Sequence, residues 1–380
     1  MINILFALNG VFNKGGTEAV VLNIFDNINK NKFHIDFLVH GSHADNDLHK
    51  YLENAGSSIF YVTPRGISYR QNTNDITEVL SKHHFDIVHS HMDAAGYFLM
   101  RIAKKLGIKT RIAHSHNTAS PFPSILSVHS FVHRIALEYA RIKLRTEATH
   151  FIACSEAAGK WLFGVNICKS DRYMLLKNGI DVANFLYNVS IRDKTRDKLR
   201  ISRHFVIGHV GRFAAQKNHQ FLINVFKEIY KRYPIAKLML VGNGELLDNV
   251  KRQITKIELP EDSVIFTGTR SDVNALYQAM DVMVLPSLFE GLPVVMVEAQ
   301  ASGVKVIASD NITNESMLIP ETEFLSLNDG VAIWANEILK YINGYTRRNT
   351  YKEIKNAGYS AKDNITGLEN FYIKALNQTK

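Results

Sequence analysis

The chain has 380 residues, of which 46% are hydrophobic and 21% are charged, and its formal net charge is +9 at pH 7. This length and composition exclude a disordered or fibrous chain and favour two domains with separate hydrophobic cores. Two cysteines are too few for a disulfide framework or a cysteine-based metal cluster, which favours a reducing cytoplasm. No window reaches the about 18 consecutive apolar residues of a membrane-spanning helix.

The first half of the chain alternates short apolar runs with longer helical patterns. The segment MINILFALNG at its start lacks a basic leader, so we expect a strand there and not a signal peptide. The alternation is typical of a parallel sheet covered by helices on both faces. Strands are predicted at residues 2–8, 33–39, 59–62, 85–90, 110–114 and 149–154.

The same alternation restarts after the charged stretch NVSIRDKTRDKLRISRH, with strands predicted at residues 205–210, 237–241, 264–266, 282–285 and 305–308. The fold class is therefore α/β with two doubly wound, Rossmann-like domains. The turn dipeptide Asn178-Gly179 ends the last strand of the first half. We predict a first domain of residues 1–188, a second of residues 189–363, and a closing helix at 364–380.

A glycine-rich turn follows the first predicted strand. Gly15 and Gly16 stand just before a helix, where a backbone without side chains can approach an anion at the helix N-terminus. Thr17 and Glu18 are also typical capping residues, so an ordinary capped turn remains an alternative. The turn is neither G-x-G-x-x-G nor a P-loop, which argues against a dinucleotide or nucleoside-triphosphate site.

Two histidine pairs follow neighbouring strands of the first half: His89 with His91, and His114 with His116. Residues two apart in a strand share one face, so the members of each pair are expected side by side. No Cys, Asp or Glu set completes a ligand list with them, and we predict no metal. Hydrogen-bonded packing and a substrate-facing pocket remain the two interpretations.

Charged residues also follow strands of the second half. Arg212 and Lys217 come after its first strand, where a forked guanidinium and a compact ammonium together could bind a diphosphate. The alternative is that both are solvated surface charges. In SLFEGLPVVMVEAQASG, Glu290 precedes a helix that begins near Pro293, and Glu298 lies within it. The spacing alone leaves an acid/base pair, a ligand clamp and a plain helix open.

These motifs together resemble the retaining GT-B glycosyltransferases of family 4. The second half contributes GRFAAQKN, LVGNGE, FTGTRSDV, DVMVLPS and EGLP with a later Glu, in that order. The first half contributes GGTE, HSHM, IAHSHNT, IACSE and KNGID, so the likeness covers nearly the whole chain. It is strongest to the branch that makes capsular, exopolysaccharide or related surface glycans. The resemblance implies the GT-B fold, two Rossmann-like domains facing across a cleft, with helix 364–380 completing the first domain.

The resemblance also implies roles for individual residues. The second domain would hold a nucleotide-sugar donor, with a UDP-sugar favoured, and the first a glycan or lipid-linked acceptor. Arg212 and Lys217 would bind the diphosphate, Glu290 the sugar hydroxyls and Glu298 the ribose. The implied catalytic residues are His116, Arg212, Lys217 and Glu290. The implied donor-binding residues are Gly16, Arg212, Lys217, Gly242, Glu290, Gly291, Leu292 and Glu298, and the acceptor-side candidates are His91, His114 and Asn117.

The resemblance further implies front-face attack with retention of anomeric configuration and no metal or other cofactor. Gln216 stands where many relatives have Glu before the lysine, a change that we expect to be tolerated. A nucleotide-sugar epimerase of the same fold remains an alternative. A basic nucleic-acid-binding protein is another, although no recognition motif supports it and no nucleic-acid partner is predicted.

The segment SILSVHSFVHRIALEYARIKLR, residues 124–145, carries apolar residues at helical spacing beside several basic residues. It predicts either an interfacial helix on an anionic membrane surface or a helix that covers the first sheet. The expected location is cytoplasmic, and the first interpretation adds peripheral attachment to the inner face of the membrane.

Overall fold

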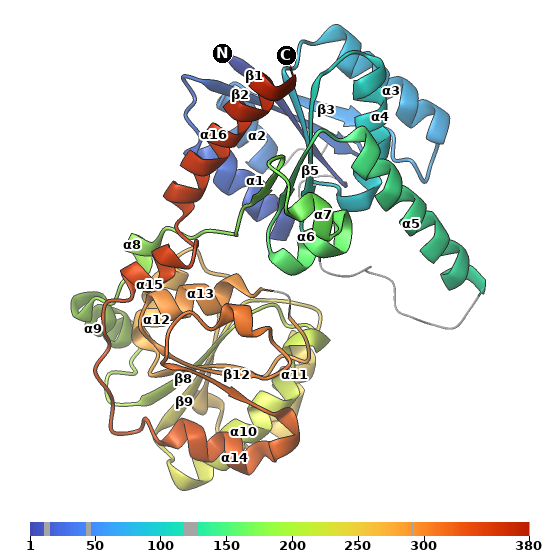
Figure 1. Cartoon of the computed structure of the whole chain (residues 1–380). Coiled ribbons are helices and arrows are strands. Elements are labelled where there is room, and N and C mark those ends of the chain that lie inside the picture. Colours follow the sequence, from blue (N-terminus) through green and yellow to red (C-terminus); the bar gives the residue numbers. More distant parts are fainter. Residues whose placement is uncertain (11–15, 43–46, 118–127, 291, 380) are drawn as a thin grey trace. The chain divides into compact units, whose positions relative to one another are not determined.

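Two parallel β-sheets organise the chain, each with its own covering helices (Figure 1). The computed structural model describes residues 1–10, 16–42, 47–117, 128–290 and 292–379. Unit 1 combines Met1–Asn178 with Lys362–Lys380, and unit 2 is Gly179–Ala361. Both predicted doubly wound sheets are thus confirmed.

Unit 1 contains a seven-stranded sheet with the strand order β3-β2-β1-β4-β5-β6-β7. Its strands are β1 (Ile2–Leu8), β2 (Phe33–His40), β3 (Ile59–Val62), β4 (Ile87–Ser90), β5 (Thr110–Ser115), β6 (His150–Ala153) and β7 (Tyr173–Leu175). Its helices are α1 (Gly16–Asn27), α2 (Asp47–Asn54), α3 (Tyr69–Lys82), the 3₁₀ helix η1 (Asp93–Gly96), α4 (Tyr97–Lys105), α5 (Val128–Glu147), α6 (Glu156–Phe163), α7 (Val165–Cys168) and α16 (Ala361–Thr379).

The core of unit 1 has two layers, one on each face of the sheet. Successive side chains of a strand point to opposite faces, so Phe6 of β1 joins one layer and Leu5 the other. Helices α1, α2 and α16 cover the Phe6 face, whereas α3, α4, α5 and α6 cover the Leu5 face. Helix α16 contributes Leu368 and Tyr372, both fully buried, to the layer around Phe6.

Unit 2 contains a six-stranded sheet with the order β10-β9-β8-β11-β12-β13. Its strands are β8 (Phe205–Val210), β9 (Ala236–Val241), β10 (Val264–Gly268), β11 (Val282–Leu285), β12 (Lys305–Ser309) and β13 (Thr322–Leu325). Its α-helices are α8 (Val182–Phe185), α9 (Val189–Lys198), α10 (His219–Arg232), α11 (Leu247–Lys256), α12 (Val273–Ala279), α13 (Val294–Ala301), α14 (Gly330–Leu339) and α15 (Tyr351–Asn356). The 3₁₀ helices are η2 (Ala215–Lys217), η3 (Glu261–Ser263), η4 (Asn314–Ser316) and η5 (Leu327–Asp329).

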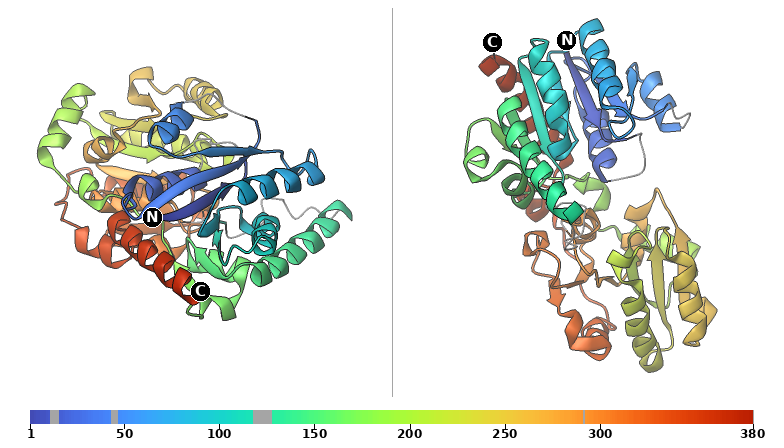
Figure 2. Two further views of the ribbon diagram at one scale, coloured as in Figure 1. Left: turned by 90° about the horizontal axis from the view of Figure 1, so that it is seen from above. Right: turned by 90° about the vertical axis from the view of Figure 1, so that its right-hand side faces the viewer.

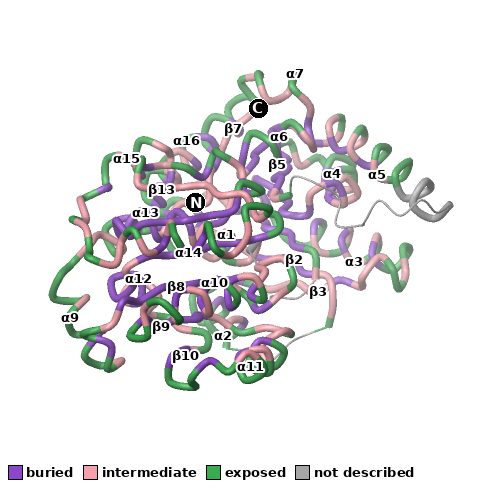
Figure 3. Tube along the Cα trace, turned by 90° about the horizontal axis from the view of Figure 1, so that it is seen from below, coloured by how far each residue is buried: buried purple, intermediate pink, exposed green. Residues whose placement is uncertain are grey.

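The core of unit 2 is layered in the same way. Helices α10, α11 and α14 cover one face of the sheet, and α12 and α13 cover the other. Buried residues run through β5 and β8, whereas α9 and α11 are mostly exposed (Figure 3). Two further views show the helices on both sides of each sheet (Figure 2). Within the described residues, no helix combines the length and the apolar character that crossing a membrane requires.

The division between the units differs from the predicted ranges at residues 179–188 and 362–363. The backbone N–H of Ile180 donates to the carbonyl of Tyr359 (2.8 Å), and Ala361 N–H donates to the carbonyl of Ile180 (3.0 Å). Val182 is buried in the same cluster as Ile180 and Tyr359. These contacts place the segment after Asn178 in unit 2, because it pairs there with the chain that leads into α16.

Every strand predicted from the sequence is present, with ends that agree within two residues. β7 was predicted only as the strand before the Asn178-Gly179 turn, without bounds, and β13 was not predicted. In each sheet the strand order reverses beside the first strand, between β1 and β4 in unit 1 and between β8 and β11 in unit 2. Ligands of open α/β sheets bind at the carboxyl ends of the strands on either side of such a reversal.

Candidate functional site

Backbone contacts lock the loops that follow β8 and β9 in unit 2. Gly211 N–H donates to the carbonyl of Val241 (2.9 Å), and Phe213 N–H donates to the carbonyl of Asn243 (3.0 Å). Gly242 has a φ of +134°, and a Cβ on it would lie 2.1 Å from the carbonyl oxygen of Gly211. Only glycine fits there, so Gly242 determines how closely the two loops approach.

Lys217 and Glu290 meet where the strand order of unit 2 reverses. Lys217 ends η2, Asn218 follows in the left-handed region with φ +53°, and α10 then begins at His219. The Lys217 Nζ lies 2.5 Å from the Glu290 Oε1, and the two side chains are only 14% and 9% exposed. A lysine after β8 and a glutamate after β11 thus form a largely buried ion pair.

Gln216 holds the same glutamate from a second direction. Its Nε2 donates to the Glu290 Oε2 (3.1 Å) and to the carbonyl of Phe289 (2.9 Å), while Leu288 N–H donates to the Gln216 carbonyl (2.8 Å). A glutamate at position 216 would bring a second carboxylate against Glu290, whereas the amide supplies a donor. Gln216 therefore fits its position through hydrogen bonding.

Arg212 lies apart from this buried pair and points into solvent. Its guanidinium contacts the Glu245 carboxylate at 3.1 Å, and the two side chains are 73% and 52% exposed. Exposed ion pairs of this kind are weak, usually below about 1 kcal/mol. An incoming anion can therefore displace Glu245 from Arg212 at low cost.

Glu298 lies on α13, which begins after the N-cap Pro293 and ends at Ser302, as predicted. The hydroxyl of Tyr277, a fully buried residue of α12, lies 2.8 Å from the Glu298 Oε2. Burial raises the pKa of Glu298 to about 7, although the Tyr277 hydrogen bond acts in the opposite direction. Glu298 is therefore a half-buried carboxyl that titrates near neutral pH.

Two buried histidines support the Lys217 loop from behind. His209, in β8, lies with its Nδ1 2.8 Å from the carbonyl of Val284. His219 stacks on Phe213 with ring centroids 4.3 Å apart. Burial, followed by the nearby charge of Lys217, lowers the pKa of His219 to about 4, so its ring is uncharged at neutral pH.

In unit 1, Asp93 anchors the segment that carries His116. Asp93 follows β4 with a φ of +46°, and its Oδ1 accepts a hydrogen bond from the backbone N–H of His116 (2.8 Å). Its Oδ2 accepts from the Asn117 side chain (2.7 Å). Burial raises the pKa of Asp93, whereas these hydrogen bonds oppose that change. The contact joins the carboxyl ends of β4 and β5.

The histidines of the two predicted pairs form one cluster, in which His89, His91 and His114 are buried and His116 is half-buried. Ring centroids are 4.2 Å apart for His89 and His91 and 4.1 Å apart for His114 and His116, which confirms that each pair shares a face. The His91 Nδ1 lies 3.0 Å from the His116 Nε2, and the His89 Nδ1 lies 2.8 Å from the hydroxyl of Tyr372 in α16. Burial lowers the pKa of His116 to about 4 and the pKa values of the other three well below their usual range, so all four rings are uncharged at neutral pH.

Gly16 and Gly291 are the other two glycines predicted to bind the donor. Gly16 is the first residue of α1, whereas Gly291 lies outside the described residues. Leu292 packs against the buried cluster that contains Ile180 and Val297.

Two family descriptions match the sequence. "Glycosyltransferase Family 4" covers residues 14–184, and "Glycosyl transferases group 1" covers residues 204–343. Over 381 aligned residues the chain is 35% identical to a Bacillus subtilis (strain 168) protein named "Putative glycosyltransferase EpsF", with 97% of this chain and 96% of that protein covered. The chain belongs to glycosyltransferase family 4.

Other family 4 relatives and several solved structures match over most of the chain. The Escherichia coli "UDP-Gal:alpha-D-GlcNAc-diphosphoundecaprenol alpha-1,3-galactosyltransferase" is 26% identical over 96% of this chain and 92% of its own. The structure of Anabaena Alr3699/HepE in complex with UDP superposes with a TM-score of 0.71 at 20% identity, covering 99% of this chain and 98% of that one. A Rickettsia africae glycosyltransferase superposes with a TM-score of 0.75 at 16% identity, covering 99% and 98%. These likenesses confirm the GT-B architecture.

In this glycosyltransferase the structure brings together some of the predicted residues. Lys217 contacts Glu290, and His91 contacts His116. Arg212 forms its ion pair with Glu245 instead. The sequence reasoning missed four residues that hold the others in place: Asp93, His209, His219 and Tyr277. Asp93 stands two residues after the HSH motif, and this position at the end of a strand could have marked it as a site residue.

Proposed function

We propose that this glycosyltransferase moves a hexosyl group from a UDP-sugar to a glycan or lipid-linked glycan acceptor in surface-polysaccharide biosynthesis. Three relatives support the proposal by their names: the E. coli galactosyltransferase above, which acts on a diphosphoundecaprenol-linked sugar, a "Capsular polysaccharide biosynthesis glycosyltransferase CapM" of Staphylococcus aureus, and EpsF. Structures of the fold neighbour HepE contain UDP or UDP-glucose.

The Lys217–Glu290 contact is the observation that carries the proposal for unit 2. A cation held by a carboxylate at the strand-order reversal has the position and charge to bind a diphosphate and to stabilise it as it leaves. Exposed Arg212 adds a forked donor for the phosphate oxygens. In the proposed complex the Glu290 carboxylate accepts hydrogen bonds from hydroxyls of the donor sugar, through the lone pairs that Lys217 and Gln216 do not use.

The remaining donor contacts follow the motif matches. Glu298 accepts hydrogen bonds from the ribose, which requires its ionised form or the free carbonyl oxygen of the acid. Gly242 leaves room for the donor to approach the backbone and Leu292 contributes a backbone contact, while Gly16 and Gly291 stay donor-binding candidates by motif match. No metal is assigned to these donor contacts, since the two cations supply the positive charge.

On the acceptor side, we place His116 beside the reacting sugar as an uncharged hydrogen-bonding group. Its low pKa makes it a poor proton donor at neutral pH, so leaving-group stabilisation falls to the cations of unit 2. Asn117 is exposed, whereas His91 and His114 are 3% and 1% exposed. We therefore assign acceptor contact to Asn117 and a supporting position behind His116 to the other two.

The function is tested with purified protein and a panel of UDP-, GDP- and ADP-sugars. Binding is measured first, followed by transfer to lipid-linked and oligosaccharide acceptors. We expect selective binding of one UDP-sugar, transfer with retention by NMR of the anomeric proton, and a large loss of turnover in Arg212→Ala. Conversion of the donor sugar to its epimer without an acceptor would support the epimerase alternative. Equal turnover of wild type and Arg212→Ala would contradict the assigned role.

We also propose that α5 attaches unit 1 to anionic lipid. Ile135, Tyr139 and Ile142 are 57%, 49% and 54% exposed and recur at helical spacing, so they line one face. Arg134 is exposed and the Nζ of Lys143 lies 5.5 Å from the Tyr139 ring centroid, which places positive charge beside this apolar face. An apolar stripe flanked by basic residues fits a negatively charged bilayer surface.

Vesicle co-sedimentation tests the membrane proposal. We expect wild type to bind phosphatidylglycerol-containing vesicles and not neutral phosphatidylcholine vesicles, and Ile135→Ser/Ile142→Ser to bind less. The matched control is Ile235→Ser, which changes an exposed isoleucine of unit 2 (48% exposed). Equal binding to both vesicle types, or an equal loss in the control, would refute the attachment through α5.

A further inference from the structure

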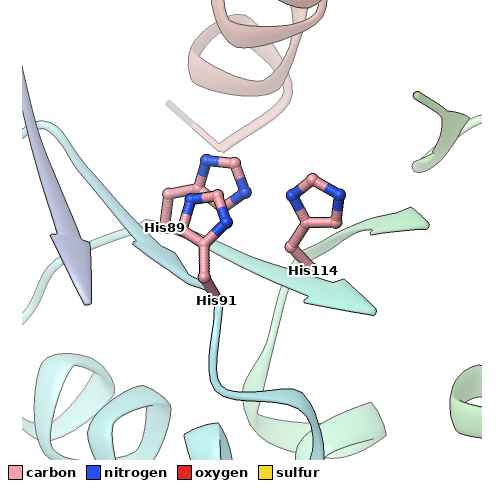
Figure 4. Close-up of side chains that lie close together, drawn as sticks. All are labelled: His89, His91 and His114. Atoms are coloured by element: carbon pink, nitrogen blue, oxygen red, sulfur yellow. The ribbon is translucent and has the colours of Figure 1, made fainter. Parts of the chain in front are cut away.

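Three buried histidines of unit 1 converge from two neighbouring strands (Figure 4). His89 belongs to β4, His91 follows it directly, and His114 belongs to β5. Their exposed fractions are 0%, 3% and 1%. One ring nitrogen from each lies within 4.8 Å of the others. Figure 4 shows a nitrogen of His89 and a nitrogen of His91 directed toward the His114 ring.

Hydrogen bonds outside the cluster determine which nitrogens of His89 and His91 carry a proton. The Nδ1 of His89 contacts the Tyr372 hydroxyl, and the Nδ1 of His91 contacts the His116 Nε2. The Nε2 atoms of both rings are buried and have no hydrogen-bond partner within the described chain. A proton on either Nε2 would be a buried, unpaired donor, so the protons belong on the Nδ1 atoms. Both Nε2 atoms then present lone pairs.

His114 completes the group, because neither of its ring nitrogens has a partner among the described residues. A buried polar atom left without a partner costs about 1–3 kcal/mol. Four such nitrogens in one cluster are difficult to reconcile with packing alone. A cation that accepts one lone pair from each ring provides a partner for three of the four, and one nitrogen of His114 remains.

We propose that His89, His91 and His114 bind a zinc ion between the carboxyl ends of β4 and β5. Uncharged imidazole is a preferred zinc ligand, and three histidines with a water molecule form a complete tetrahedral set. The nitrogens that face away from the ion, the Nδ1 atoms of His89 and His91, donate to Tyr372 and His116, as metal-bound histidines usually do.

The geometry requires only local adjustment. Zinc–nitrogen distances of about 2.1 Å place tetrahedral ligand atoms about 3.4 Å apart, so the widest pair must close by about 1.4 Å. A metal lies near the plane of each ligating ring, whereas the rings of His89 and His114 are stacked, with centroids 5.3 Å apart and an inclination of 11°. At least one of these two side chains must therefore rotate when the metal binds. The sequence predicted no metal because it offered no acidic or cysteine ligand, but a site of three histidines needs none.

The ion also bears on His116, and this step alone rests on the proposed function. Zinc on the Nε2 of His91 withdraws electron density from the ring, which makes its Nδ1–H a stronger donor to the His116 Nε2. The ion thereby fixes the orientation of the His116 ring and leaves its Nδ1 protonated. His91 acts here as a positioning residue.

Metal content tests the site without reference to transfer. Protein prepared without metal-affinity resin is treated with a chelator, dialysed against Zn²⁺ alone and analysed by elemental mass spectrometry. We expect one zinc ion per chain, nitrogen scatterers at about 2.0–2.1 Å by X-ray absorption, and a higher melting temperature with zinc than without it. His114→Ala should lose the ion, whereas the exposed control His84→Ala should retain it.

Tyr372→Phe guards against misfolding of the His114 variant, since it preserves the ring and removes only the hydroxyl that contacts His89. We expect its zinc affinity to fall about 10–100-fold, the usual effect of losing such a partner. The site is refuted if wild type binds no zinc after this treatment, or if His114→Ala and His84→Ala bind it equally. UDP-sugar binding in the same samples reports on unit 2, so failure of the zinc site leaves the proposed function separately testable.

Discussion

Replacing Glu298 with glutamine should stabilise the protein at pH 8 and leave its stability nearly unchanged at pH 4. Burial raises the pKa of Glu298 from 4.5 to about 7. The change to Gln keeps the shape and the acceptor for the Tyr277 hydroxyl, which lies 2.8 Å from the Glu298 Oε2, but removes the ionisation. The comparison therefore isolates the cost of a buried negative charge.

The sign follows from proton binding. Below pH 4.5 the carboxyl is protonated in both the folded and the unfolded chain, so Glu298 contributes no pH dependence there. Between 4.5 and about 7 the unfolded chain loses the proton while the folded chain retains it, and stability falls as the pH rises. Above about pH 7 the carboxylate is ionised in both states and the full loss of stability is present. For this difference in pKa the loss is at most about 3 kcal/mol.

Urea unfolding of wild type and Glu298→Gln at pH 4, 6 and 8 measures this cost. The expected advantage of the variant grows from near zero to about 3 kcal/mol across the series. Other titrating groups are common to both proteins and cancel in the difference. Equal urea midpoints at pH 8 would refute the raised pKa. A constant advantage at all three pH values would show that the change acts through packing instead.

Three further variants follow from the geometry of unit 2. Lys217→Ala should lower stability by about 3 kcal/mol, because it leaves the largely buried Glu290 carboxylate without its cation. The double variant Lys217→Ala/Glu290→Gln should recover stability but not sugar transfer. Urea midpoints measure the first effect and turnover measures the second. Arg212→Ala should change stability by less than about 1 kcal/mol and reduce turnover, and a large fall in its melting temperature would contradict its exposed position. Gly242→Ala should destabilise more than Gly268→Ala, since both have positive φ but only at Gly242 would a Cβ meet backbone within 4 Å; equal urea midpoints would count against the proposed loop contact.

Much of the fold could be predicted because most strands are continuous buried apolar runs. β8 and β9 are buried at every position, and such runs between helical patterns have few other interpretations. β7, at the edge of its sheet, has no fully buried residue, and β13, also at an edge, has one. β7 lies in the short apolar run at residues 173–176 before the Asn178-Gly179 turn, whereas β13, with the sequence TEFL, has no continuous apolar run and gave no signal.

The site was predictable in its members and not in its contacts. Lys217 and Glu290 were identified by motif, but their contact depends on β8 and β11 being neighbours, a property of strand order that no local pattern contains. Tyr277 looked like an ordinary core residue of a helix, and its hydroxyl near Glu298 could not be inferred. For the same reason the sequence did not show that the rings of His89, His91 and His114 lie close together.

The position of α16 in the core of unit 1 has a consequence for the order of folding during synthesis. Unit 2 is a continuous segment, Gly179–Ala361, and its core is complete once that segment has left the ribosome. Unit 1 lacks Leu368 and Tyr372 until residues after 361 emerge, so the part of the Phe6 face that α16 packs against stays uncovered while the rest of the chain is made. The half that is translated first is therefore the half that matures last, and its exposed apolar face is where a nascent-chain chaperone would bind.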